Sequence, residues 1–395
     1  MLFKTIAACS LLLLTLPAGA QTNFLRYTGL HLPKDSVAVA GLTDALDDFL
    51  GQKEKPNHEN TRILPEDLLT TSILVDELKG IERSAQFKDS SFYKCYLMNA
   101  VPLGKGDFLV QLSYMTTIYL GSKANIPFLR ASFRLIARQT DKGFYFSSPL
   151  KSNAAGWNTK TIHNYTFYYK NSLDIAQANA YVATTMRYDQ KLGAPTEPRK
   201  CYYCAHFPEA LQMIGVDYKL DYNGYASISL SARERDTSLV VGCYNGTGEL
   251  FDPHDLWHAR LRKVVSPALI NKPVDEGCAF LYGGSWGLSW SQIYQLFMKQ
   301  IASRRDADWL GFYEKDEDFN NDASKPLMAS YMINALIIRQ LEKDKGFGAV
   351  KTLLSCGQYE KTNDAYFKTL EQLTGINRTN FNERVGKLIR ESRKA

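Results

Sequence analysis

Two histidines four residues apart are the clearest chemical signal in the chain. They are His254 and His258, in the segment Asp-Pro-His-Asp-Leu-Trp-His at 252–258. Asp252 can cap a helix and Pro253 fits the first helical position, so a helix is expected from there to about residue 265. Residues four apart lie on one helical face, and the two imidazoles can therefore bind one metal ion together.

A third ligand is expected from Glu276, eighteen residues after His258. It lies at the start of a second predicted helix, which Pro273 and the pair Gly283-Gly284 bound. Two histidines and one glutamate leave a coordination position open for water, which is the arrangement of catalytic zinc sites. The sequence thus predicts a Zn²⁺ site. The simpler alternative is that the histidines are partly buried core residues and Glu276 a surface carboxylate at a helix start.

At these residues the chain resembles the gluzincin zinc metallopeptidases, the clan with a His-Glu-x-x-His motif and a downstream Glu. The segment Val274-Asp275-Glu276-Gly277-Cys278-Ala279 looks like the clan's second motif, in which Gly and a small residue follow the ligand Glu. The order of elements over about 160–395 is similar to that of short peptidase MA-like members. The resemblance implies a mostly helical metallopeptidase domain that hydrolyses peptide bonds in a peptide or protein substrate through a water activated by Zn²⁺.

Asp255 departs from that pattern, because the clan has Glu directly after the first His. The resemblance gives Asp255 the role of the general base, but its side chain is one methylene shorter. A misplacement of about one ångström can cost on the order of 10²-fold in rate. Asp255 also falls where an acidic side chain favours a helix N-terminus. A catalytically impaired pseudo-peptidase that binds peptides or proteins is therefore the alternative function.

The resemblance also implies a tyrosine or histidine on a later helix that stabilises the oxyanion. Tyr331 stands in about the right region, on a helix predicted to begin after Pro326. Tyr282 and Tyr313 are rival candidates for this role. Each of the three can instead be an aromatic residue that packs between helices.

The chain is predicted to be an α+β protein with two domains. Of its 395 residues, 45% are hydrophobic and 22% charged, which is a globular composition. Strand-rich runs such as 108–119 and 128–138 predict a small α+β domain over 21–160. A helix at 172–192, short strands and then longer helices predict the peptidase MA-like domain over 161–395.

Residues 1–20 have the pattern of a secretory signal peptide, with an apolar run followed by Ala18-Gly19-Ala20. The mature chain is therefore expected to be exported, periplasmic or extracellular, with no membrane span and no nucleic-acid partner, since its positive charge is spread along the chain. It keeps six cysteines, some of which can pair. The pair Cys201 and Cys204 leaves open a structural, a metal-binding or a thiol-redox role, while Cys278 is expected in the core.

Overall fold

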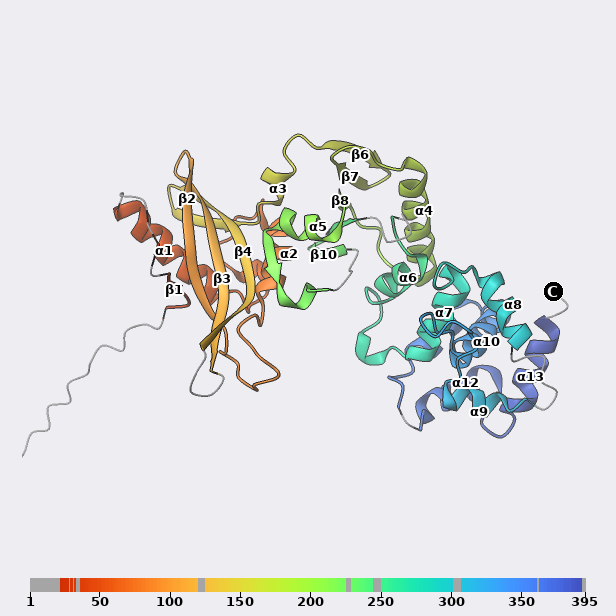
Figure 1. The fold of residues 1–395 in the computed structure, drawn as a ribbon. Coiled ribbons are helices and arrows are strands. Elements are labelled where there is room, and N and C mark those ends of the chain that lie inside the picture. The colour runs from red at the N-terminus through yellow and green to blue at the C-terminus, as the bar shows by residue number, and fades with distance from the viewer. Residues whose placement is uncertain are drawn as a thin grey trace, which may run out of the picture. The chain divides into compact units, whose positions relative to one another are not determined.

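The structure is a computed structural model, and it describes residues 22–27, 29–30, 32, 36–119, 125–224, 229–243, 250–300, 307–360 and 362–392. The expected signal peptide at 1–20 lies outside the described residues. Helices and strands are both abundant, which confirms the mixed α+β class (Figure 1).

The chain divides into two compact units. The first comprises Met1–Ala155 and Leu211–Ser227, and the second Gly156–Ala210 and Ile228–Ala395. From the sequence, two continuous domains were expected, with one boundary near residue 160. The structure differs because the chain returns to the first unit, where β9 (Val216–Lys219) pairs with β4 (Asn125–Thr140).

The first unit is built on a mainly antiparallel sheet with the strand order β1-β2-β3-β4-β5, and β9 adds to β4. Figure 1 shows the long strands β2, β3 and β4 side by side. The other elements of this unit are β1 (Leu25–Arg26), α1 (Ser36–Gly51), η1 (Asn57–Glu59), α2 (Leu68–Leu78), β2 (Lys94–Gly104), β3 (Asp107–Tyr119), β5 (Gly143–Ser147), α3 (Leu150–Asn153) and η2 (Leu220–Tyr222).

Every second side chain along the strands is buried, and these side chains form the core of the first unit. On β4, the fully buried residues alternate with residues that are only partly covered; the buried ones are Ala131, Phe133, Leu135 and Ala137. Such a period of two places every second side chain on one face of the sheet. Helix α1 contributes Phe49, whose ring lies 5.1 Å from that of Phe146 on β5.

The second unit begins with a five-stranded sheet in the order β10-β11-β8-β7-β6. Strand β8 runs parallel to both of its neighbours, whereas the two outer pairs are antiparallel. The elements are β6 (Asn158–Ile162), β7 (Tyr165–Tyr169), α4 (Ile175–Leu192), β8 (Arg199–Cys204), β10 (Ser229–Glu234) and β11 (Thr237–Cys243). Helix α5 (Phe207–Ile214) contains the division between the units.

Helices form the remainder of the second unit. They are α6 (Pro253–Leu261), η3 (Pro267–Leu269), α7 (Lys272–Gly283), α8 (Trp290–Gln300), α9 (Trp309–Lys315), α10 (Ala329–Lys345), α11 (Phe347–Leu354), α12 (Asp364–Thr374) and α13 (Phe381–Ser392). One continuous core of buried side chains joins β7, β8, α4 and these helices. Cys278 is fully buried in it, as predicted. Among the described residues, no helix combines the length and the apolar character needed to cross a bilayer.

Candidate metal centre

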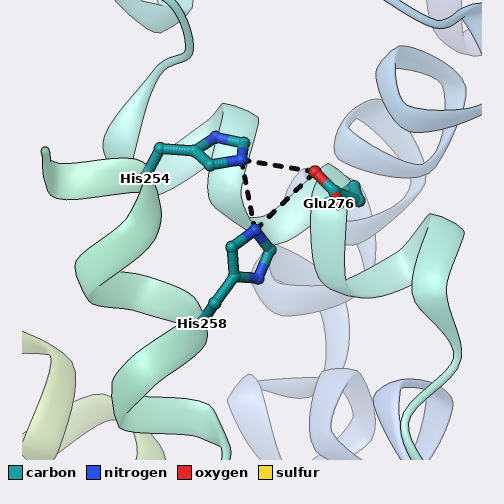
Figure 2. A group of neighbouring side chains, drawn as sticks. All are labelled: His254, His258 and Glu276. Atoms are coloured by element: carbon teal, nitrogen blue, oxygen red, sulfur yellow. Dashed lines mark hydrogen bonds and ion pairs between the residues drawn. The ribbon is translucent and has the colours of Figure 1, made fainter. Parts of the chain in front are cut away.

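Helix α6 carries both histidines of the predicted site. It begins where the sequence predicts, because the Asp252 side chain accepts a hydrogen bond from the His254 amide (2.8 Å) and Pro253 occupies the first turn. It ends at Leu261, earlier than the predicted residue 265. Figure 2 shows that the imidazoles of His254 and His258 point from this helix toward Glu276.

Helix α7 carries Glu276 and packs closely on two neighbouring helices. A Cβ atom on Gly277 would lie 2.8 Å from the Cβ atom of Asn334 on α10. A Cβ atom on Gly283 would lie 2.7 Å from the backbone nitrogen of His254 on α6. Both contacts are too short for a side chain, so glycine at these positions allows the approach that brings Glu276 to the histidines.

The three predicted ligands lie together. The His254 and His258 Nε2 atoms are 3.1 Å apart, and Glu276 Oε2 lies 3.3 Å from the first and 3.7 Å from the second (Figure 2). Bonds of about 2.0–2.2 Å at tetrahedral angles place neighbouring zinc ligands about 3.3 Å apart. The side chains keep 10–19% of their surface exposed, so the group is partly open to solvent. The donor set and its spacing therefore fit Zn²⁺.

The second nitrogen of each imidazole is held by a protein acceptor. His254 Nδ1 lies 2.7 Å from the carbonyl oxygen of Gly284, and His258 Nδ1 lies 2.9 Å from Asp275 Oδ2. The indole of Trp257 donates to the other oxygen of Asp275 (3.0 Å). An imidazole that donates through Nδ1 presents a free electron pair at Nε2, as a metal ligand must.

Sequence reasoning missed Asp275 and Gly284, because it searched for groups that bind a metal and not for groups that orient the ligands. The only available signal for an orienting group was the carboxylate of Asp275, directly before Glu276. Its side chain is buried, as is that of its partner Trp257.

Charge interactions link the three side chains to one another and to Asp275. Burial alone would lower the pKa of His258, but hydrogen bonds to Asp275 and Glu276 outweigh it and raise this pKa to about 9. Burial would raise the pKa of Glu276, whereas hydrogen bonds from the two histidines lower it to about 2. Burial would also lower the pKa of His254, but its interactions with Glu276 and the Gly284 carbonyl together outweigh burial and raise this pKa. The carboxylates thus favour positive charge at this place, carried either by protons on the imidazoles or by a cation bound instead of them.

Asp255 follows His254 on α6, and its side chain is exposed. It lies in the first turn, where a carboxylate also favours the helix dipole. Asp255 is thus adjacent in the chain to the predicted ligand His254, and its own side chain is in contact with solvent.

Of the three candidate tyrosines, Tyr331 is the one whose pKa is raised by the charge of a predicted ligand. It is on α10, and its ring is 5.7 Å from that of Phe280 on α7. Burial chiefly raises the pKa of Tyr331, and the negative charge of Glu276 raises it further. Tyr282 donates to Glu342 (2.6 Å), and the Tyr313 hydroxyl accepts from Asn363 (3.0 Å) in the core, so both hydroxyls have other partners.

Burial works against thiolate formation at Cys201 and Cys204. The six cysteines of the described residues carry no disulfide, and Cys201 and Cys204 are both buried. Burial raises the pKa of each to about 12, which suppresses the reactive thiolate. These observations favour the structural role among those that the sequence left open.

Comparison with known protein families finds no matching family, and comparison with curated proteins finds no match.

Proposed function

We propose that the second unit is the metallopeptidase domain of an exported, zinc-dependent peptidase that acts on peptides or proteins. The observation that carries this proposal is the spacing of 3.1–3.7 Å among His254 Nε2, His258 Nε2 and Glu276 Oε2. A bound Zn²⁺ would polarise a scissile carbonyl and make water a better nucleophile at neutral pH. The three residues that would hold it are those predicted from the sequence.

The chain's own residues would carry the proton and stabilise charge. Asp255 would accept a proton from the attacking water and pass it to the leaving amine. The Tyr331 hydroxyl, whose raised pKa keeps it protonated, would donate a hydrogen bond to the oxyanion. Gly284 and Asp275 would hold the imidazoles in orientation.

The second candidate is a pseudo-peptidase, a binding module for peptides or proteins with the same centre. The shorter side chain of Asp255 favours this alternative, because its carboxylate has less reach than glutamate. Both candidates share a metal centre, and they differ in whether a bound peptide is cleaved.

Metal analysis by plasma mass spectrometry tests the centre first. The purified protein is expected to hold about one zinc per chain, and the His254→Ala, His258→Ala double variant none. A matched His58→Ala, His206→Ala variant removes two exposed histidines elsewhere and should keep its zinc. A quenched-peptide library then tests for cleavage that a chelator stops and zinc restores. If neither the wild type nor the control holds zinc after it is supplied, the proposal fails.

A further inference from the structure

Trp286 is an exposed aromatic residue directly beyond helix α7. Half of its surface is exposed (50%), although tryptophan is among the most apolar side chains. It belongs to the turn Ser285-Trp286-Gly287-Leu288, in which the Ser285 and Leu288 backbones exchange two hydrogen bonds (3.0 and 2.8 Å). This turn follows Gly284, whose carbonyl accepts from His254, so Trp286 lies close in the chain to the metal centre.

The backbone of this turn is poorly suited to tryptophan. Trp286 has φ +54° and Gly287 has φ +77°. Two successive residues with positive φ form a type I′ hairpin turn, which favours Asn or Gly at the first of these positions. A bulky residue in this conformation is strained, and such strain is typically retained where it serves a function.

The indole is nevertheless held in a fixed place. Its Nε1 donates to the carbonyl oxygen of Pro326 (3.0 Å). Pro326 precedes α10, the helix that begins at Ala329 and carries Tyr331. Trp286 therefore connects the end of the Glu276 helix to the start of the Tyr331 helix while its surface stays open to solvent.

Other exposed apolar residues lie at the opposite end of α7. Among the described residues of the second unit, the large exposed apolar side chains are Ile175, Met186, Leu269, Trp286 and Tyr359. Leu269 lies three residues before α7, and Tyr359 lies two residues after Gly357, whose amide donates to the Leu269 carbonyl (3.0 Å) and whose carbonyl accepts from Asn271 (3.2 Å). Three of these five side chains thus lie by the two ends of the helix that carries Glu276.

We propose that Trp286 is a specificity-determining residue, whose indole binds a bulky apolar side chain of a peptide held at the metal centre. The inference rests on the proposed function and adds a substrate class to it. An extended peptide rises about 3.3 Å per residue, so a few residues on either side of the metal would reach both ends of α7. Peptides rich in bulky apolar residues are therefore the expected ligands.

A binding experiment tests this inference without relying on turnover. The full chain carries Asp255→Asn throughout to prevent cleavage, with zinc supplied. Two fluorescein-labelled octapeptides of equal charge serve as probes, one with Phe-Leu at its centre and one with Ser-Gln. Fluorescence anisotropy gives the two dissociation constants, and we expect the Phe-Leu peptide to bind about tenfold more tightly.

The informative variant is Trp286→Asn, because asparagine suits the turn. We expect it to unfold at a temperature no lower than that of the parent and to lose the preference for the Phe-Leu peptide. Trp286→Phe should keep most of the preference. Phe87→Ala, which removes an equally exposed aromatic ring (48%) from the first unit, should change nothing.

The inference is overturned if Trp286→Asn keeps the tenfold preference, or if the parent binds neither peptide. Zinc content and cleavage by the protein with Asp255 intact report separately on the proposed function. A protein that binds with the preference but does not cleave would contradict the peptidase proposal and leave the role of Trp286 supported. Cleavage without any preference between the two peptides would support the peptidase proposal and contradict the role of Trp286.

Discussion

At the scale of single residues, Asp255 decides between a peptidase and a binding module. Its carboxylate is exposed next to His254, and glutamate would extend it by one methylene. If the base is present but too short, Asp255→Glu should raise kcat/KM for peptide cleavage by up to about 10²-fold, while zinc content stays unchanged.

The matched control is Asp364→Glu, the same change at an exposed position in the first turn of α12. It should leave cleavage as it is. A protein that cleaves no peptide with either Asp or Glu at position 255, yet still binds zinc, would support the binding module instead.

Asp275 is a positioning residue on the same scale. It holds the Nδ1 of His258 at 2.9 Å and also accepts from Trp257. Removal of such a partner typically weakens metal affinity 10–100-fold. We therefore expect Asp275→Ala to raise the zinc dissociation constant about 10–100-fold, measured by competition with a chelating dye. An affinity within twofold of the wild type would mean that Asp275 serves only to pack α7 against α6.

The candidate ligands could be predicted from sequence because helix geometry alone relates His254 to His258. Glu276 needed its Gly-Cys-Ala context, since a lone glutamate at a helix start has many uses. Asp275 and Gly284 could not be predicted. Which acceptor faces the far nitrogen of a histidine depends on how two helices pack, and spacing along the chain does not encode that.

At the scale of the elements, Gly277 sets the distance between α7 and α10. A methyl group there would approach the backbone of Tyr331 and Ala335 to 3.0 Å, and backbone atoms cannot turn aside as a flexible side chain can. Gly277→Ala is expected to lower the free energy of unfolding by about 1–3 kcal/mol and to weaken zinc binding. Gly348→Ala on α11, where an added Cβ meets nothing within 4 Å, is the control. Equal stability of the two variants would refute the prediction.

Glu197 joins elements around α6 and gives the unit a pH dependence. Its carboxylate accepts from Lys263 (2.8 Å), just beyond α6, and pairs with Arg233 on β10. Burial raises the pKa of Glu197, but these cations outweigh it and lower this pKa below the usual 4.5. A lowered folded pKa stabilises the protein above 4.5, and this stabilisation disappears as the pH falls through the folded value.

The Glu197→Gln variant should therefore be less stable than the wild type near neutral pH, and the difference should shrink below pH 4.5. Urea unfolding followed by tryptophan fluorescence measures it. All five tryptophans of the chain lie in the second unit, so the signal reports on that unit. A difference that stays constant across this pH range would show that the ion pairs do not account for the stabilisation.

Helix positions agreed well with the sequence where local signals exist. Helix α4 starts at its Asp174 cap and ends at Gly193 in the left-handed region. The end of α6 was predicted too far along the chain, because the three residues after Leu261 form tight turns in which Val264 and Val265 both donate to its carbonyl. Apolar periodicity continues through such a turn, so it does not show where the helix ends.

At the scale of the whole molecule, the return of 211–227 to the first unit was beyond sequence reasoning. Strand β9 has four residues, Val216–Lys219, and no local pattern tells which distant strand it joins. Its pairing with β4 depends on contacts far apart in the chain, such as the hydrogen bond from Arg134 to the Gly215 carbonyl (2.7 Å). A prediction from sequence alone assigns such a segment to the domain that contains the residues before and after it in the chain.

This topology makes a prediction about the first unit. Glu77 on α2 is buried, and its carboxylate accepts from Lys219 (2.7 Å) and from Tyr222 (2.9 Å). A fragment of residues 22–155 would lack both partners, and loss of the partner of a buried carboxylate costs up to about 3–5 kcal/mol. The fragment alone is expected to unfold at a lower temperature, or to stay unfolded, compared with the same fragment joined through a Gly-Ser linker to 211–224.

Circular dichroism gives the melting curves of the fragment and of the joined form. A third protein, joined to a segment that carries Lys219→Met and Tyr222→Phe, separates the contribution of the Glu77 partners from that of strand β9. That variant restores the pairing of β9 with β4 but not the partners of Glu77, so its stability should fall between those of the other two. Because the missing strand would expose the edge of β4 as well, the loss should exceed the ion pair alone. If the fragment of 22–155 is as stable as the joined form, 211–227 contributes nothing to the first unit, and a single boundary near residue 160 describes the chain after all.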